Sequence, residues 1–320
     1  MLDTIPTLQV DTPGLLTTVQ DCGRTGYSGQ GIPVGGAMDR CALQCANLLT
    51  GAARGAAALE ITLLGPGLTV LTDCTLALAG ADLGMQIDGQ PAAPWRSYFV
   101  LAGSKIIFRR PRTSQGSRAY LALSGGLDVP VVLGSRSTCL SAGFGGFEGR
   151  SLLAGDLLNA YPLAQTRPGR ALKQSEPASP KPILRIIRGP EWTRFTLSSR
   201  RRILREPYTV SQASNRMGYR LTGPALAFRR GAQADIITES ALFGTIQVTS
   251  DGLPLLLMAD HQTTGGYARI GTVISTDLKI AAQLAPGDQV WFEEIGLAEA
   301  EILAVEQEKY LRLLERTLTW

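Results

Sequence analysis

The sequence predicts a mostly β protein built from two domains. Short runs of aliphatic, aromatic and β-branched residues alternate with glycine and proline over most of its length, and the 320 residues include 36 glycines and 18 prolines. Such runs are typical of strands, and the glycines between them supply the positive φ that tight turns need. Because 320 residues exceed one ordinary hydrophobic core, we expect two domains.

The strand pattern recurs on both sides of the middle of the chain. Asp88-Gly89 between two short runs is the plainest signal of a hairpin turn. In order, the clearest runs cover residues 15–19, 75–79, 97–101, 118–123, 183–187, 244–248 and 289–292. We therefore expect barrels or sandwiches in both halves.

The domain boundary is predicted where the composition changes. Between residues 163 and 182 the sequence is rich in Arg, Pro, Ser, Gln and Lys, and its prolines interrupt ladder pairing. This segment is predicted to be a linker. The predicted organisation is an N-terminal β-barrel domain over 1–162, a Pro-rich linker over 163–182 and a C-terminal β-barrel domain over 183–320.

Two segments have a helical period. Over 37–49 the apolar residues recur at helical spacing and Gly51 follows as a stop signal, which predicts a short helix in the N-terminal domain. Over 297–318 the alternating pattern gives way to an apolar stripe that includes Leu303, Tyr310 and Leu314. This predicts a C-terminal amphipathic helix packed on the second domain.

Composition and charge exclude several classes of protein. Apolar residues make up 44% and charged residues 18%, so the chain can bury a core. The first residues carry no export signal, and no run of about 18 uncharged apolar residues occurs, so we expect a cytoplasmic protein with no membrane segment. The Arg clusters at 109–112 and 200–202 lack interleaved aromatics, which favours a solvated face or a subunit interface over nucleic-acid binding.

The cysteines predict neither disulfides nor a metal site. Five cysteines, at 22, 41, 45, 74 and 139, are an odd number in a long chain, which is unlike a secreted disulfide framework. His261 is the single histidine and lies far from them in sequence. We therefore expect reduced thiols and no bound metal.

Most familiar catalytic signatures are missing from the sequence. It contains no P-loop, no Gly-x-Gly-x-x-Gly opening a helix, no Gly-x-Ser-x-Gly elbow and no His-Glu-x-x-His. A Met-Lys-Met biotin attachment site is missing too. Any carrier or activating nucleotide should therefore come from solution or from a partner.

The densest polar segment covers 258–267 and follows an apolar strand. An aspartate at a strand end, here Asp260, is well placed as a general base, and the neighbouring hydroxyls and backbone N–H groups suit an oxyanion. An ordinary turn stabilised by Asp and Thr side chains is the alternative, and His261 is expected to be a wall or surface residue. The candidates are Asp260, Gln262, Thr263 and Thr264 for catalysis and Gly265, Gly266 and Tyr267 for binding.

Two further segments supply binding candidates. The planar guanidinium of Arg216 or Arg220 could hold a carboxylate or a phosphate, although a surface salt bridge explains them equally well. Asp39 at a helix start also has a structural explanation, because it can cap free N–H groups. The candidates are Asn215, Arg216, Met217, Gly218 and Arg220 in the segment over 211–224 and Arg24 and Asp39 in the segment over 19–39.

Together, seven ordered motifs resemble one family, that of allophanate hydrolase subunit 2 and the KipI antagonist. This family includes the C subunit of 5-oxoprolinase and the corresponding half of the carboxyltransferase of urea carboxylase. The resemblance covers nearly the whole chain. The motifs are TVQDCGR at 18–24, GAMD at 36–39, ALEIT at 58–62, YLALSGGLDVP at 120–130, LGSRST at 133–138, NRMGYRL at 215–221 and ADHQTTGGY at 259–267.

The resemblance implies two cyclophilin-like β-barrel domains and a site shared with a partner. The implied partner is an allophanate hydrolase subunit 1-type protein, which is the B subunit in 5-oxoprolinase, together with an A subunit of the LamB/YcsF type. The implied substrate is a small-molecule amide. The 5-oxoprolinase members use ATP, which would be supplied to the complex, whereas the carboxyltransferase members use carboxybiotin.

Three functions stay open at this point. The first is that of one component of an ATP-dependent cyclic-amide hydrolase that opens 5-oxoproline to L-glutamate and is active only in complex, and the unfused length of the chain favours it. The second is a carboxyltransferase half acting on urea or a related amide. The third is a non-catalytic regulator like the KipI antagonist. Under both enzymatic functions Asp260→Asn should lower turnover and leave folding intact.

Overall fold

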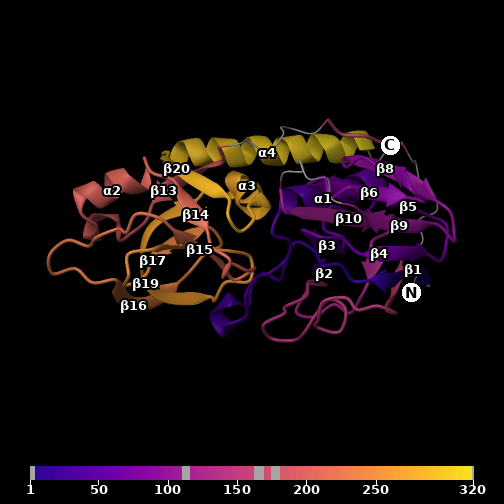
Figure 1. The fold of residues 1–320 in the computed structure, drawn as a ribbon, viewed down its shortest axis with the longest axis horizontal. Coiled ribbons are helices and arrows are strands. Elements are labelled where there is room, and N and C mark those ends of the chain that lie inside the picture. Colours follow the sequence, from indigo (N-terminus) through magenta and orange to yellow (C-terminus); the bar gives the residue numbers. More distant parts are fainter. Residues whose placement is uncertain (1–3, 110–115, 162–168, 174–180, 319–320) are drawn as a thin grey trace. The chain divides into compact units, whose positions relative to one another are not determined.

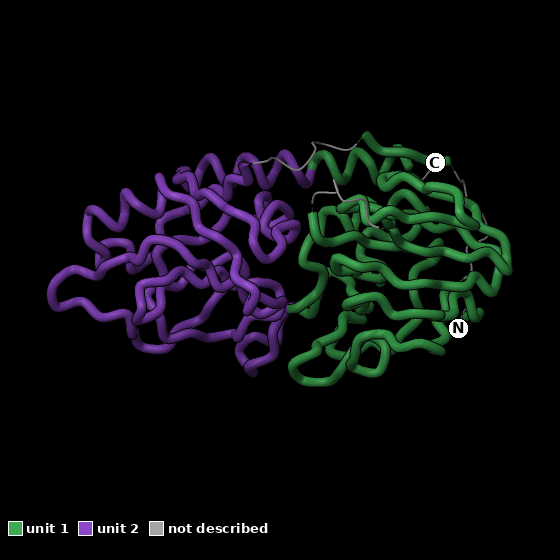
Figure 2. Tube along the Cα trace, in the orientation of Figure 1, with its two compact units in different colours: residues 1–24, 35–177, 309–320 green, residues 25–34, 178–308 purple. Residues whose placement is uncertain are grey.

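The computed structural model describes residues 4–109, 116–161, 169–173 and 181–318. Contacts divide the chain into two compact units, unit 1 with residues 1–24, 35–177 and 309–320 and unit 2 with residues 25–34 and 178–308 (Figure 2). Segments 25–34 and 309–320 thus group differently from the linear domain division that the sequence predicts. Most of the predicted linker, 163–168 and 174–180, lies outside the described residues.

Unit 1 is built from two antiparallel sheets (Figure 1). The seven-stranded sheet has the order β11-β12-β1-β4-β9-β6-β7 and contains β1 (Ile5–Thr12), β4 (Gly67–Val70), β6 (Met85–Ile87), β7 (Gln90–Pro91), β9 (Lys105–Phe108), β11 (Leu127–Asp128) and β12 (Leu157–Ala160). The five-stranded sheet has the order β2-β3-β10-β5-β8 and contains β2 (Leu16–Gln20), β3 (Ala58–Thr62), β5 (Cys74–Gly80), β8 (Arg96–Val100) and β10 (Arg118–Leu123).

The main core of unit 1 lies between its two sheets. Leu8 and Leu68 of the larger sheet and Leu59, Leu78 and Leu121 of the smaller sheet are fully buried in one cluster. Alternate residues of the smaller sheet face the opposite way, as the period of two in a strand requires. That second face is covered by helix α1 (Arg40–Thr50), which contributes Ala42, Leu43 and Ala46 to a separate apolar cluster.

The predicted turn and helix signals of unit 1 are confirmed. Asp88 and Gly89, which join β6 to β7, have φ of 50° and 79°, as a two-residue hairpin turn requires. Asp39 is the N-cap of α1, and Gly51 ends the helix in the left-handed conformation with φ of 80°. Local sequence therefore sets both ends of this helix.

Unit 2 contains a closed barrel. The ring β13-β20-β14-β15-β18-β17-β19 closes because β13 pairs with both β20 and β19, and β16 extends the sheet beyond β19. A closed ring leaves the barrel strands without free edges. The strands are β13 (Ile183–Arg188), β14 (Tyr208–Val210), β15 (Gly218–Thr222), β16 (Asp235–Ser240), β17 (Thr245–Val248), β18 (Pro254–Leu257), β19 (Thr264–Val273) and β20 (Gln289–Glu294).

Short helices and one long helix complete the described chain. These are η1 (Ser28–Gln30), η2 (Trp192–Arg194), α2 (Leu197–Ile203), η3 (Ser275–Asp277), α3 (Leu278–Gln283) and α4 (Leu297–Leu318). The predicted mostly β fold with barrel architecture, an N-terminal-domain helix and a C-terminal helix is confirmed. Within the described ranges, we find no helix with the length and apolar character to cross a membrane.

The C-terminal helix α4 packs differently from the prediction. Its first turns lie beside unit 2, where Leu297, Ala300 and Ala304 line an apolar depression with Ile187 and Leu278. The expectation that the whole helix packs on the second domain is wrong for its last turns. There Leu311 and Leu314 are buried in the cluster of α1 in unit 1, because the apolar stripe continues along the helix past the residues that belong to unit 2.

Candidate functional site

Strand pairing in unit 2 brings two of the predicted segments together. Strand β15 pairs antiparallel with β18, with Gly218 opposite Leu257, so the residues before β15 face the residues after β18. The backbone N–H of Asp260 donates to the carbonyl of Arg216 at 2.9 Å. These ladder contacts hold Arg216 and Asp260 side by side although 44 residues separate them in sequence.

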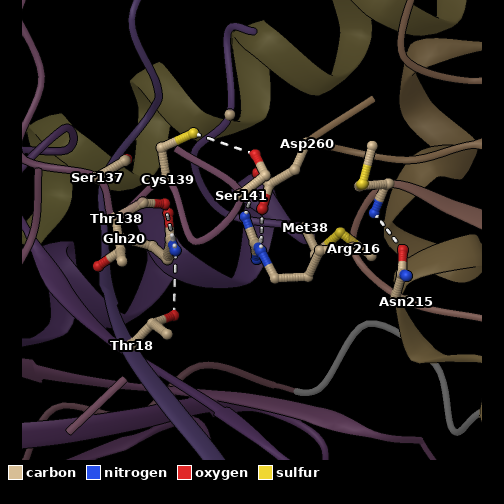
Figure 3. Close-up of polar contacts among 12 residues, drawn as sticks. Thr18, Gln20, Met38, Ser137, Thr138, Cys139, Ser141, Asn215, Arg216 and Asp260 are labelled. Carbon is tan, nitrogen blue, oxygen red and sulfur yellow. Dashed lines mark hydrogen bonds and ion pairs between the residues drawn. The ribbon is translucent and has the colours of Figure 1, made fainter. Parts of the chain in front are cut away.

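Arg216 and Asp260 form a buried, bidentate ion pair. Nε of Arg216 lies 2.8 Å from Oδ2 of Asp260, and Nη2 lies 2.9 Å from Oδ1 (Figure 3). Only 5% of the Arg216 side chain and 4% of the Asp260 side chain are exposed. Fork-on-carboxylate geometry is among the strongest hydrogen-bonded arrangements in proteins, and it fixes both planes. The structure therefore places the candidate base and the candidate anion-binding residue in direct contact with each other.

The pair changes what Asp260 can do chemically. Each carboxylate oxygen already accepts one hydrogen bond from the guanidinium, and each has a second lone-pair direction. Proton removal by Asp260 would have to use one of these remaining directions, so the general-base role stays a prediction. Removing Asp260 would also leave the buried charge of Arg216 without its counterion. In contrast to the expectation from sequence, we therefore expect Asp260→Asn to lower stability as well as turnover.

The turn before β15 is organised by Asn215. Its Oδ1 accepts a hydrogen bond from the N–H of Met217 at 2.8 Å (Figure 3). Its own backbone N–H donates to the carbonyl of Gly218. Asn215 and Met217 are exposed on either side of the buried Arg216. The turn thus places a polar amide at the surface next to the buried ion pair.

Arg220 lies further along β15, and its side chain is exposed. A hydrogen bond from Thr249 is the main cause of the lowered pKa of Asp251, and the charge of Arg220 lowers that pKa further. Arg216 is buried against one carboxylate, whereas Arg220 interacts with another across the surface. The two arginines therefore occupy different environments.

The segment after Asp260 is a strand, not an open loop. Thr264, Gly265, Gly266 and Tyr267 lie in β19, where Thr264 pairs with Ser240 of β16. A Cβ on Gly265 would come within 2.1 Å of Nε2 of the buried Gln247. A side chain at this position would thus displace the amide of Gln247, a residue that the sequence did not single out. The role of Thr263 to Gly266 at an oxyanion stays a prediction.

The residues between Asp260 and β19 differ in exposure. His261 and Thr263 are buried, whereas Gln262 is exposed. Nδ1 of His261 lies 2.6 Å from the carbonyl oxygen of Gln262, and burial lowers the pKa of the imidazole. The carbonyl of Thr263 accepts from the N–H of Ala241. His261 is thus a wall residue, as the sequence predicts, and Gln262 is a polar side chain that solvent can reach.

In unit 1 a row of buried polar side chains lies beneath the N-terminus of α1. Glu60 accepts hydrogen bonds from the hydroxyl of Tyr120 at 2.7 Å and from the N–H of Met38 at 2.8 Å. The Tyr120 oxygen accepts from the N–H of Asp39 at 2.7 Å. Burial and the charge of Glu60 raise the pKa of Tyr120 well above its usual value. Asp39 is therefore held in place as a helix cap.

The sequence did not single out Glu60 and Tyr120 of this row, nor the buried Gln20. Gln20 is fully buried on β2, and its amide donates to Thr18 and to the carbonyl of Thr138 (Figure 3). A signal did exist, because an acidic residue in the apolar strand ALEIT at 58–62 is unexpected on a buried face.

Among the described residues, no group of three or more His, Cys, Asp or Glu side chains is arranged to hold a metal.

We predict that Tyr120→Phe destabilises unit 1 by about 1–3 kcal/mol, because Glu60 loses a donor and the N–H of Asp39 loses its acceptor inside the core. Denaturant unfolding of the chain measures this change. Tyr98→Phe is the matched control, because the Tyr98 hydroxyl bonds a single carbonyl, that of Ala93, on a half-buried site. An equal or smaller loss in Tyr120→Phe than in Tyr98→Phe would contradict the role of the buried row.

Comparison with known proteins places the chain in a family. The carboxyltransferase domain, subdomain A and B, matches residues 30–294. The chain is 39% identical to the 5-oxoprolinase C subunit of Escherichia coli (strain K12), over 96% of this chain and 97% of that protein. It is 37% identical to the 5-oxoprolinase C subunit of Haemophilus influenzae, over 93% of this chain and 94% of that protein.

Solved structures agree with the sequence comparison. The crystal structure of Kluyveromyces lactis urea carboxylase superposes with a TM-score of 0.88 at 28% identity and covers 99% of this chain, which spans 30% of that protein. The crystal structure of TTHA0988 superposes with a TM-score of 0.82 at 34% identity, and the chain spans 55% of it. The resemblance seen in the motifs is thereby confirmed, and the chain belongs to the carboxyltransferase domain family, subdomain A and B, together with the named 5-oxoprolinase C subunits.

Proposed function

We propose that the chain is the C subunit of an ATP-dependent 5-oxoprolinase that opens 5-oxoproline to L-glutamate. The observation that supports this most is the match to the E. coli C subunit, which extends over 97% of that protein. In the urea amidolyase of Saccharomyces cerevisiae the corresponding match is 29% identical and occupies 18% of the protein. The matched region thus spans nearly the whole of the first protein and a small part of the second.

In this proposal the Arg216–Asp260 pair is the part of the catalytic machinery that unit 2 supplies. An amide is a poor nucleophile and a poor electrophile, so removal of its proton assists activation at oxygen. The guanidinium fixes the plane of the Asp260 carboxylate, and a remaining lone pair of that carboxylate takes the amide proton. Asn215 and Gln262, which are exposed beside the pair, would orient the amide.

ATP is assigned to the assembled complex and not to this chain alone, because its sequence contains no P-loop. The proposed partners are the subunit 1-type protein, which is the B subunit, and the A subunit of the LamB/YcsF type. A complex of this kind leaves the isolated chain without part of the site. We therefore expect the purified chain alone to produce no glutamate from 5-oxoproline.

A second candidate function is supported by the fold. Carboxyltransferase activity with carboxybiotin and urea or a related amide fits the family match and the superposition on urea carboxylase over 99% of the chain. The same pair would then remove the proton from the amide nitrogen that receives the carboxyl group. Both functions use Asp260 at one chemical step, and they differ in the co-substrate.

Reconstitution with the two partner proteins separates these functions. We expect ATP-dependent release of glutamate from 5-oxoproline by the three-component mixture and none by the chain alone. Incorporation of labelled bicarbonate into urea in the presence of a biotinylated carrier, without glutamate release, would replace the first function by the second. If neither product forms although the three proteins assemble, the chain acts as a regulator of its partner and the proposal fails.

A further inference from the structure

Arg24 is an unusual residue because its charge is buried without a counterion. It follows β2 in unit 1, and only 1% of the residue is exposed. Its Nη2 donates to the carbonyl of Ser137, and its Cζ lies 4.7 Å from the ring centroid of Phe144. Nε and Nη1 are buried and have no hydrogen-bond partner in the described part of the chain. The guanidinium therefore retains donors that the surrounding protein does not use.

Nearby acidic side chains do not neutralise Arg24. Asp21 lies three residues earlier, but its Oδ1 accepts from the N–H of Gly23 and from the hydroxyls of Ser135 and Ser137. Its Oδ2 accepts from the N–H of Arg136 at 2.6 Å. Asp21 thus fixes the loop at 135–137. No ion pair to Arg24 is present among the residues that the structure describes, so its charge needs another source of compensation.

The energetic argument favours an anion from outside the chain. Arginine keeps its proton in proteins, so burial cannot neutralise it as it can neutralise a lysine. The aromatic face of Phe144 offsets part of the desolvation, since such contacts contribute about 2 kcal/mol when desolvated. That is less than the cost of burying an unpaired charge. A negatively charged ligand would supply the rest of the stabilisation that the buried charge of Arg24 needs.

The backbone around Arg24 makes room for the guanidinium. Gly145 has φ of 70°, and a Cβ built on it would lie 2.9 Å from Nη2 of Arg24. A side chain at this position would therefore press on the group that binds the Ser137 carbonyl. The glycine, the Phe144 ring and the Ser137 carbonyl form a cradle that holds the guanidinium in one plane.

We propose that Arg24 is a subsite for a small planar oxyanion, namely a carboxylate. Nε and Nη1 lie on different edges of the guanidinium, so a carboxylate would pair with one of them and with the second N–H of Nη2. A planar, small carboxylate matches such a fork. The choice of 5-oxoproline among the carboxylates tested rests on the proposed function. The subsite itself does not, because its evidence is the uncompensated charge.

The test is a titration of the chain with carboxylates. Affinities in wild type and in Arg24→Lys are compared by the backbone amide resonance of Gly145, which both proteins contain and which lies beside the guanidinium. In wild type the ¹⁵N resonance of the Arg24 Nε–H group, assigned by its absence in Arg24→Lys, reports contact with the guanidinium itself. We expect acetate and L-5-oxoproline to shift this resonance in a saturable manner. 2-Pyrrolidinone, the same lactam ring without a carboxylate, should not shift it, nor should sodium chloride at equal ionic strength. Arg24→Lys should weaken acetate binding at least about ten-fold, because the fork is lost while the charge is kept.

Two control variants separate binding from stability. Arg109→Gln removes an exposed charge from the same unit and should leave the acetate affinity unchanged. Phe144→Leu removes the aromatic contact and should lower stability while the carboxylate shift persists. Binding of acetate without binding of 5-oxoproline would keep the subsite and count against the proposed substrate. No saturable shift with any carboxylate, or equal affinities in wild type and Arg24→Lys, would overturn the subsite.

Discussion

Replacing Asp260 by Asn should lower the free energy of unfolding of unit 2 by about 3–5 kcal/mol, because it removes the carboxylate of the bidentate ion pair with the buried Arg216. Denaturant unfolding followed by the fluorescence of Trp192 and Trp291, which both lie in unit 2, measures this loss. The double variant Arg216→Met with Asp260→Asn should recover at least half of it, since no charge then stays buried.

The surface pair of Arg202 and Glu206 provides the control for this result. Its side chains are 39% and 48% exposed, so Glu206→Gln should cost no more than about 1 kcal/mol. A loss in Asp260→Asn as small as that in Glu206→Gln would contradict a buried, desolvated ion pair. A double variant as unstable as the single variant would show that the charge of Arg216 is not the cause.

The second large effect is expected on turnover in the assembled complex. The double variant Arg216→Met with Asp260→Asn removes the proposed base and its orienting group, and it avoids a buried unpaired charge. Positioned general-base catalysis contributes about 10²–10⁴-fold in rate, so turnover should fall by roughly that factor. The Michaelis constant and assembly with the partners should change little. Steady-state kinetics of glutamate release by the reconstituted complex measures both quantities.

Local sequence signals predicted the class of the fold and part of its elements. Helix α1 begins after a capping Asp39 and ends at Gly51, and the turn at Asp88-Gly89 uses the two residues that tolerate positive φ. These signals depend on neighbours in sequence, so a single sequence reveals them. The grouping of 25–34 with unit 2 and of 309–320 with unit 1 depends on contacts between distant segments, and no periodicity encodes it.

The sequence identified only part of the candidate site, because the site also depends on contacts between distant segments. Arg216 and Asp260 both stood out by residue type, but their pairing depends on the register of β15 with β18, in which Gly218 faces Leu257. The sequence therefore assigned them two separate roles. The sequence makes Gly265 a binding candidate, and the structure places it in β19 beside Gln247. Composition alone cannot distinguish a glycine needed for a turn from one needed for close packing.

The most direct test of the proposed site compares two ion pairs of unit 2 in one assay. Arg185 and Asp277 form a second bidentate pair, with Nε to Oδ2 at 2.8 Å, and have no role in the proposed site. Glutamate release should fall about 10²–10⁴-fold in the complex with Arg216→Met and Asp260→Asn. It should stay close to wild type in the complex with Arg185→Met and Asp277→Asn. Near-wild-type turnover in the first complex, once assembly is verified, would make the Arg216–Asp260 pair a structural element and place the catalytic base in a partner protein.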